Sequence, residues 1–346
     1  MPKISLMIHT ASFDDFLKNQ GINSYFESLI DNLERQTFKD FEFIYIDTFY
    51  EDNKDRFASY PSSFCVKHVP VHPNHRYWYD LGYVYISAAK NTGILYADGE
   101  LLVTCDDAEF FPDNLLEKYW KYYEIGHLLH AHHKRMTRIN THDGKLTFPI
   151  EGDIYVNDHR FNHVKNGGYY PHKHGTWLFA GTSFPLAEAL LLNGFNERMD
   201  GCKSLEDCEF GTRLALTGLK FLLDHDGYIY ILDHQSYGNE TATFGPDGPA
   251  TSPKPHETKK KDIKNLIAIE NHGFCCCANE LREIKANAKP LTEKHWEIIQ
   301  RETLKYRNFD PLAPENKENL DIWTKTPTFD LKKERKALRN SPDWKW

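Results

Sequence analysis

Short apolar strands alternate with helical segments across the first third of the chain. Continuous apolar runs predict strands, and apolar residues at three- and four-residue spacing predict helices. The strands are expected at residues 4–9, 41–46, 65–71 and 101–104, and the helices at 24–33, 81–96 and 114–123. This order predicts an α/β fold with a parallel sheet. In such sheets ligands bind beyond the carboxyl ends of the strands.

Composition narrows the class of protein. The chain has 346 residues, of which 40% are hydrophobic, enough for one large domain with or without an appendage. No apolar run is long enough to span a bilayer, and the N-terminus resembles a first strand more than a signal peptide. The seven cysteines show no spaced framework, which predicts reduced thiols and a cytoplasmic location. The net charge of −8 disfavours nucleic acid as a partner.

The sharpest local signal is the segment LLVTCDDAEFFPDNLL at residues 101–116. An apolar strand ends in Asp106 and Asp107, and Glu109 follows closely. Adjacent carboxylates repel each other unless a cation or hydrogen bonds compensate. Divalent hard cations prefer such oxygen ligands. Taken alone, the segment is as consistent with a capped, solvated turn as with a metal site.

Other segments follow one another in a recognisable order. They are PKISLMIHTAS at 2–12, RQTFKDFEFIYID at 35–47, AAKNTGILYADGELL at 88–102, AGTSFPLAEALLLNGFNE at 180–197 and LEDCEFGTRLALTG at 205–218. Together with the acidic segment, they resemble the motifs of family 2 glycosyltransferases over residues 2–235. The resemblance implies a GT-A (Rossmann-like) fold, with a mostly parallel central sheet flanked by helices.

The resemblance also assigns residues to a nucleotide-sugar donor. It implies that the donor is bound by Thr10, Ala11, Asp47, Lys90 and Asp106. Asp106 would lie near the ribose or the metal. Lys90 stands where Arg is common, and a phosphate contact and a place on the helix surface are its two interpretations.

Metal and catalytic roles follow in the same way. Asp107 and His234 would bind Mn²⁺ or Mg²⁺, because carboxylate and imidazole ligands suit these ions. Asp207 would be the general base, with Glu206 beside it. Cys105 stands where many members carry a third Asp, which is a departure from the family pattern.

Four residues are assigned to the acceptor. Gly181 and Thr182 belong to the segment that resembles the family's acceptor-side strand. Trp177 has a flat apolar face that suits a sugar ring, with core packing as the alternative. His174 precedes this segment and is assigned to the acceptor pocket, with a structural loop as the alternative.

The predicted organisation has three parts. Residues 1–238 would form the catalytic domain, with a nucleotide-sugar half at 1–125 and an acceptor half at 126–238 that includes an irregular stretch at 137–176. Residues 239–262, rich in Gly, Pro, Thr and Lys, would be a mobile loop or linker. Residues 263–346 would be a helical C-terminal extension.

These inferences predict an inverting, metal-dependent glycosyltransferase with a donor that is UDP-linked and a carbohydrate or glycoconjugate acceptor. Three alternatives stay open: a noncatalytic sugar-binding or scaffold protein on the same fold, a transferase acting on a modified nucleic-acid base, and a nucleotidyltransferase. The last would need a Gly-rich phosphate loop after the first strand, which HTASFDD lacks. A homo-oligomer is compatible with the sequence.

Overall fold

In the computed structural model of this chain, the described residues cover much of positions 1–232 and the C-terminal end. They are residues 1–10, 17–18, 21–80, 85–157, 169–171, 181–195, 197, 200, 206–207, 210–211, 214, 217, 219–232, 329–342 and 344–346. The predicted linker at 239–262 lies outside them. So do four of the predicted site residues, Ala11, His174, Trp177 and His234.

Four parallel strands form one half of the main sheet, in the order β4–β1–β2–β3. These strands are β1 (Ile4–Thr10), β2 (Phe41–Asp47), β3 (Cys65–Val69) and β4 (Leu101–Cys105). The segments between them contain α2 (Tyr25–Leu33), α3 (Tyr50–Ala58), the 3-10 turn η1 (Pro73–His75), α4 (Tyr77–Asp80) and α5 (Ile86–Tyr96). The prediction of a parallel sheet within residues 1–125 is confirmed.

The sheet continues beyond β4 with β11, β6, β12 and β10 in that order. Strand β11 is antiparallel to both β4 and β6, and β12 is parallel to β6, so β6 and β12 share the direction of β4. The bounds are β6 (Leu128–Ile139), β10 (Tyr169–Pro171), β11 (Thr182–Pro185) and β12 (Phe221–Leu232), with the short β5 (Glu109–Phe110) paired to β12. The predicted fold class, α/β with a mostly parallel sheet flanked by helices, is confirmed.

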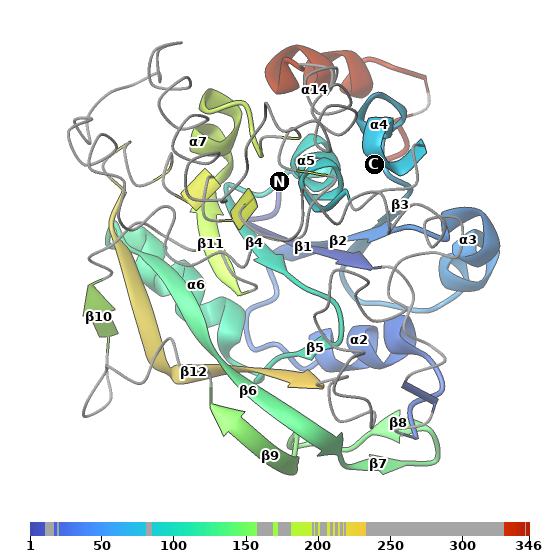
Figure 1. Ribbon diagram of the computed structural model, residues 1–346, viewed down its shortest axis with the longest axis vertical. Coiled ribbons are helices and arrows are strands. Elements are labelled where there is room, and N and C mark those ends of the chain that lie inside the picture. The colour runs from blue at the N-terminus through green and yellow to red at the C-terminus, as the bar shows by residue number, and fades with distance from the viewer. Residues whose placement is uncertain are drawn as a thin grey trace, which may run out of the picture.

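Helices cover both faces of the parallel strands. In Figure 1, α5 and α14 (Leu331–Arg339) lie on one side of these strands, and α2 and α6 (Leu115–Glu124) lie on the other. Every residue of β2 is buried, as expected of a strand covered on both faces. Helix α2 begins after Ser24, whose hydroxyl accepts a hydrogen bond from the backbone N–H of Glu27.

Residues 137–157 are more regular than the sequence analysis predicts. Strand β6 runs to Ile139 and pairs with β9 (Gly152–Asn157), while β7 (Thr141–His142) and β8 (Lys145–Leu146) form a hairpin. Its turn is Asp143–Gly144, both with positive φ, a pair typical of tight hairpins. Exposed side chains such as Arg138 hide the strand pattern, because this end of β6 lies beyond its pairing with β11. The predicted irregular stretch is therefore wrong as far as residue 157.

The predicted C-terminal extension is described from residue 329, where it includes α14. This helix contacts α5 and α7 (Leu186–Leu191). The division of the chain into domains stays a prediction. Among the helices of the described residues, none has both the length and the apolar character that crossing a membrane requires.

Candidate active site

The topology creates a switch point between β1 and β4. From β1 the chain proceeds to β2 and β3 on one side, and it returns to β4 on the other. Crevices beyond the carboxyl ends of the strands at such points are the usual ligand sites of open α/β sheets. The register pairs Thr10 with Asp47, and Ile8 with Cys105. Thr10, Asp47 and Asp106, all assigned to the donor, therefore lie at one edge of the sheet.

The acidic turn after β4 is held by its neighbours. The backbone N–H of Asp106 donates to Glu109 Oε2 at 3.1 Å, and the N–H of Leu232, the last residue of β12, donates to the carbonyl of Ala108 at 3.0 Å. Ala108 has a φ of 58°, a left-handed conformation that costs a non-glycine residue about 1 kcal/mol. Strain of this kind concentrates at functional sites. Asp106 is exposed and Asp107 is half-buried.

Glu109 is fully buried beneath this turn. Burial, reinforced by the charge of Asp106, raises the pKa of the Glu109 carboxyl well above its usual range. His133 of β6 faces it, with Nε2 at 3.9 Å from Glu109 Oε1. A protonated Glu109 adds no third negative charge to Asp106 and Asp107.

Lys90 of α5 points into the site. Its side chain is 7% exposed, and its Nζ lies 3.8 Å from Glu206 Oε1 and 5.3 Å from the ring centre of Phe195. Burial favours the neutral amine, but the charges of Asp106, Glu206 and Asp207 outweigh it and raise the pKa of Lys90. The interpretation of Lys90 as a helix-surface residue is wrong, because the acids surrounding this ammonium make its burial possible.

Glu206 and Asp207 form the third part of the site. Glu206 is buried and Asp207 is half-buried. Burial and the charge of Asp207 raise the pKa of Glu206 to about 7, although Lys90 acts in the opposite direction. Proton transfer is most efficient when the pKa of the acid or base lies near the working pH. Glu206 therefore has a pKa in the range that suits proton transfer near neutral pH.

His9 joins the same site and was not singled out in the sequence. Burial and the charge of Lys90 lower its pKa to about 4, against the opposing effect of Asp106 and Asp47. The imidazole is therefore neutral near pH 7, and its Nε2 lies 3.3 Å from the hydroxyl of Thr48. Its position just before Thr10, at the carboxyl end of β1, is the signal that could have identified it.

Asp47 and Thr10 are both buried where the sequence assigns them to the nucleotide. Both carboxylate oxygens of Asp47 accept hydrogen bonds within the protein, from the backbone N–H of Phe49 at 2.7 Å and from the Asn53 side chain at 2.9 Å. His68 Nε2 is also 2.9 Å from Asp47 Oδ2. If the nucleobase of a donor were to hydrogen-bond to Asp47, it would have to share or replace one of these partners.

Two of the residues assigned to the acceptor are described: Thr182 is the first residue of β11, and Gly181 directly precedes it. Gly181 has a φ of 75°, and its carbonyl accepts from the N–H of Ala131 at 2.9 Å. Thr182 is buried, with its hydroxyl 2.7 Å from Nδ1 of His130. The assignments of both residues to the acceptor stay predictions.

The acidic turn after β4 is the candidate place for a metal ion. Within the described part of the chain, no three His, Cys, Asp or Glu side chains are grouped so that they could hold a metal ion. Asp106 and Asp107 supply carboxylate oxygens at the end of β4, and these suit a hard divalent cation. The other predicted ligand, His234, lies outside the described residues.

A pocket of about 430 Å³ lies where β6, β9 and β12 meet. Its lining includes Lys134, Met136, Ile150, Ile154 and Tyr230. Tyr230 precedes Leu232 by two residues on β12, and Leu232 bonds the acidic turn at Ala108. The pocket and the acidic turn are therefore joined by one strand.

Comparison with known proteins finds distant structural similarity only. No family model matches the sequence, and no curated protein matches it. Among solved structures, S. aureus TarS 1–349 in complex with UDP-GlcNAc has a TM-score of 0.46 and 13% identity, covering 96% of this chain and 89% of that one. The same fragment with UDP gives a TM-score of 0.44 and 14% identity, with the same coverage. Similarity at this level defines neither a family nor an activity.

Proposed function

We propose that this chain is a glycosyltransferase that moves a sugar from a nucleotide-diphosphate donor, with UDP favoured, to a hydroxyl of a carbohydrate or glycoconjugate. The observation that carries the proposal is the convergence of Lys90, Asp106 and the Glu206–Asp207 pair at the carboxyl edge of the sheet. Lys90 and Asp106 come from α5 and the turn after β4, and the Glu206–Asp207 pair lies 100 positions beyond Asp106 in the sequence. The ordered motifs between Thr10 and Asp207 support the same reaction class.

An inverting transfer needs a base. The acceptor oxygen attacks the anomeric carbon from the face opposite the diphosphate, and the bond from that carbon to the diphosphate oxygen breaks. The diphosphate leaves with the electron pair, and the hydroxyl proton passes to a base within hydrogen-bond reach. Asp207 is the proposed base, because it is the less buried member of the pair. Glu206 holds its own proton below about pH 7, which limits the repulsion between the two carboxylates.

Lys90 supplies fixed positive charge in this reaction. As negative charge develops on the leaving diphosphate, an ammonium in a site with little water stabilises it more than it would in bulk solvent. The acids that surround Lys90 keep it protonated before the donor arrives.

A divalent cation is a further part of the proposal. Asp106 and Asp107 would hold Mn²⁺ or Mg²⁺, with His234 as the other predicted ligand. The ion, when bound, would neutralise charge on the diphosphate. The test is therefore made with and without metal.

The pocket lined by Tyr230 and Lys134 is our candidate for the acceptor side. Its volume of about 430 Å³ lies in the range of small-molecule sites. Tyr230 offers an aromatic ring, and Lys134 and Glu151 offer groups that can bond hydroxyls. These features fit a carbohydrate better than an apolar ligand.

The deciding experiment is isothermal calorimetry with UDP, GDP, CMP and TDP, each with and without Mn²⁺. The variants are Asp107→Asn and, as a matched control, Asp40→Asn, an exposed residue that precedes β2 at the opposite edge of the sheet. We expect one nucleotide to bind only with Mn²⁺, and Asp107→Asn to weaken that binding at least about tenfold. Asp40→Asn should bind as the wild type does.

Each other outcome has a defined meaning. Equal binding with and without Mn²⁺ would keep the donor site and overturn the metal. Failure of the folded protein to bind any nucleotide would overturn the transferase and favour the noncatalytic sugar-binding alternative.

A further inference from the structure

Helix α5, which carries Lys90, is a helix that its own sequence supports weakly. Asn91, Thr92 and Gly93 lie together in its middle, and all three rank below the good helix formers. No side chain of its own N-cap residue, Tyr85, bonds its first turn. The position of Lys90 therefore depends on tertiary contacts that hold α5.

Both ends of α5 are held by polar side chains from distant segments. At its start, the carboxyl oxygens of Asp200 accept from the N–H groups of Ser87 at 2.7 Å and Ala88 at 2.9 Å. At its end, Arg335 and Arg339 of α14 donate to the carbonyls of Leu95 at 2.8 Å and Ala97 at 3.2 Å. Positive charges at the end of a helix complement its dipole.

The middle of α5 is bonded to the turn that contains residues 193–195 and to Glu197. The Asn91 amide donates to the carbonyl of Phe195 at 2.9 Å and to Glu197 Oε1 at 2.7 Å, and its oxygen accepts from the N–H of Phe195 at 2.7 Å. Asn193, in the same turn, bonds the start of α14. Its side-chain amide donates to the carbonyl of Phe329, and its side-chain oxygen accepts from the N–H of Leu331. The turn thus joins α5 to α14.

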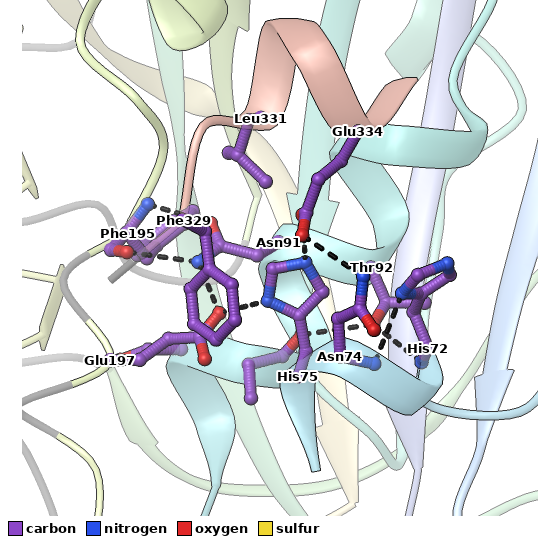
Figure 2. A network of polar contacts seen from close by, with 12 residues as sticks. His72, Asn74, His75, Asn91, Thr92, Phe195, Glu197, Phe329, Leu331 and Glu334 are labelled. Carbon is purple, nitrogen blue, oxygen red and sulfur yellow. Dashed lines mark hydrogen bonds and ion pairs between the residues drawn. The ribbon is translucent and has the colours of Figure 1, made fainter. Parts of the chain in front are cut away.

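His75 completes this junction, as Figure 2 shows. Its ring is fully buried between two carboxylates, with Nδ1 at 2.5 Å from Glu197 Oε1 and Nε2 at 2.9 Å from Glu334 Oε2. Glu334 belongs to α14, and its other oxygen accepts from the Asn74 amide at 3.1 Å. The ring of Phe329 lies 4.3 Å from the His75 ring.

The charges around His75 favour its protonated form. Burial alone would lower the pKa of His75, but its bonds to Glu197 and Glu334 raise it to about 9. His72, beside it on the same segment, has a pKa lowered to about 4 by burial and by His75, so it is neutral near pH 7. Behind Glu197 lies Asp200, whose pKa is raised well above its usual range by burial and by Glu197. One buried cation therefore joins α14 to the turn that bonds α5.

We propose that α14 acts as a latch: it holds α5 in place and so keeps Lys90 next to Asp106, Glu206 and Asp207. The contacts of His75 with Glu197 and Glu334 stabilise the docked position of α14 in a pH-dependent way. His75, Glu334 and Arg335 are positioning residues in this arrangement. The part that concerns Lys90 rests on the proposed function. The latch itself is a statement about structure and is tested without any substrate.

The test is hydrogen–deuterium exchange of the full chain, with rates corrected for intrinsic exchange, in peptides from α5, α14 and α2. The variant is Glu334→Ala, and the matched control is Lys332→Ala, an exposed side chain on the same helix. Alanine keeps helix propensity high in both. At pH 7 we expect Glu334→Ala to exchange about tenfold faster in α5 as well as α14, with α2 unchanged. Lys332→Ala should match the wild type.

The pH series separates a latch from a simple loss of packing. The excess exchange of Glu334→Ala over the wild type in α5 should shrink as the pH rises through about 9, because His75 then loses its charge. Faster exchange confined to α14, or no change in either helix, would overturn the proposal. If Glu334→Ala does not fold, the wild type alone decides: protection of α5 must fall relative to α2 between pH 7 and pH 10, and constant relative protection overturns the latch.

Discussion

At the scale of single residues, Glu206 and Asp207 are neighbours in the chain with different surroundings. Glu206 is buried against Lys90, whereas Asp207 is half-buried. Two carboxyl groups whose environments differ can divide the work of proton transfer. In our proposal Asp207 takes the proton of the acceptor hydroxyl, and the protonation state of Glu206 sets how much negative charge lies next to Asp207.

Asp207→Asn should remove the proposed base while keeping the shape of the site. We expect the transfer rate to fall by about 10²–10⁴-fold, the usual contribution of a positioned base. Nucleotide affinity, measured by calorimetry, should stay within about threefold of the wild type, because the amide keeps the volume of the acid. A transfer rate equal to that of the wild type would assign the base elsewhere.

The pH dependence of transfer should report Glu206. Its pKa of about 7 is raised above the usual value, so the charged form becomes dominant only above neutral pH. A charged Glu206 beside Asp207 makes Asp207 a stronger base, so the rate at low donor concentration should rise through about pH 7. Glu206→Gln should remove this rise of the rate with pH. Lys90→Gln should move the rise to higher pH, because Lys90 lowers the pKa of Glu206. A rise of the rate at the same pH in both variants would contradict its assignment to Glu206.

The raised pKa of Glu206, which favours catalysis above neutral pH, lowers the stability of the folded protein there. A carboxyl whose pKa is raised on folding favours the folded state below its unfolded pKa, and this contribution is lost as the pH rises through about 7. The site is thus least favourable to folding at the pH where Glu206 is charged, a cost that functional sites often carry.

At the scale of elements, the approach of β6, β11 and β12 requires glycine at one position. Gly181 has a φ of 75°, and a Cβ there would overlap Cδ1 of Ile229 and approach the Cβ of Ala131. Gly181→Ala should lower the free energy of unfolding by about 2–4 kcal/mol, the sum of backbone strain and overpacking. Denaturant titration measures this.

Gly126→Ala provides the matched control. Gly126 has a φ of 82°, but a Cβ there would meet nothing within 4 Å. This variant should cost about 1 kcal/mol, from backbone strain alone. Equal losses in the two variants would show that the close approach at Gly181 is unimportant.

Strong periodicity made some elements predictable. The strands at residues 4–10 and 41–47 and the helix at 115–124 agree with the sequence because continuous burial or an amphipathic pattern dominates their composition. Helix α3 was not predicted, since Phe57 is its one buried residue and most of its other side chains are charged. Strand β12 includes the charged Asp224 among its apolar residues, and Asp224 pairs with Lys118 at 3.0 Å.

At the scale of the whole molecule, the His75 cluster should make stability depend on pH. The pKa of His75 rises on folding from 6.5 to about 9, a difference that corresponds to about 3 kcal/mol. This contribution is complete below the unfolded pKa and is lost as the pH rises through 9. The wild type should therefore exceed His75→Gln in unfolding free energy at pH 6, and the gap should narrow by pH 10.

Denaturant titrations of both proteins at each pH measure this gap. Removing one partner of a buried ion pair typically costs about 3–5 kcal/mol, so the difference at pH 6 should be well above error. A gap of constant size between pH 6 and pH 10 would show that His75 acts through packing and not through its charge.

The sequence by itself determined the α/β class, the positions of the parallel strands along the chain and the acids at their carboxyl ends. All three follow from local patterns that repeat every two to four residues. It also placed Lys90 within a motif, but the burial of Lys90 was decided by tertiary structure, since only the acids of two other segments compensate its charge. His75 and Glu334 carry no local signal at all, and Glu197 ends a segment that the sequence singles out without indicating these partners. They lie up to 259 positions apart and become one buried cluster only when α14 docks, because an ion pair across such a distance in sequence is specified by packing.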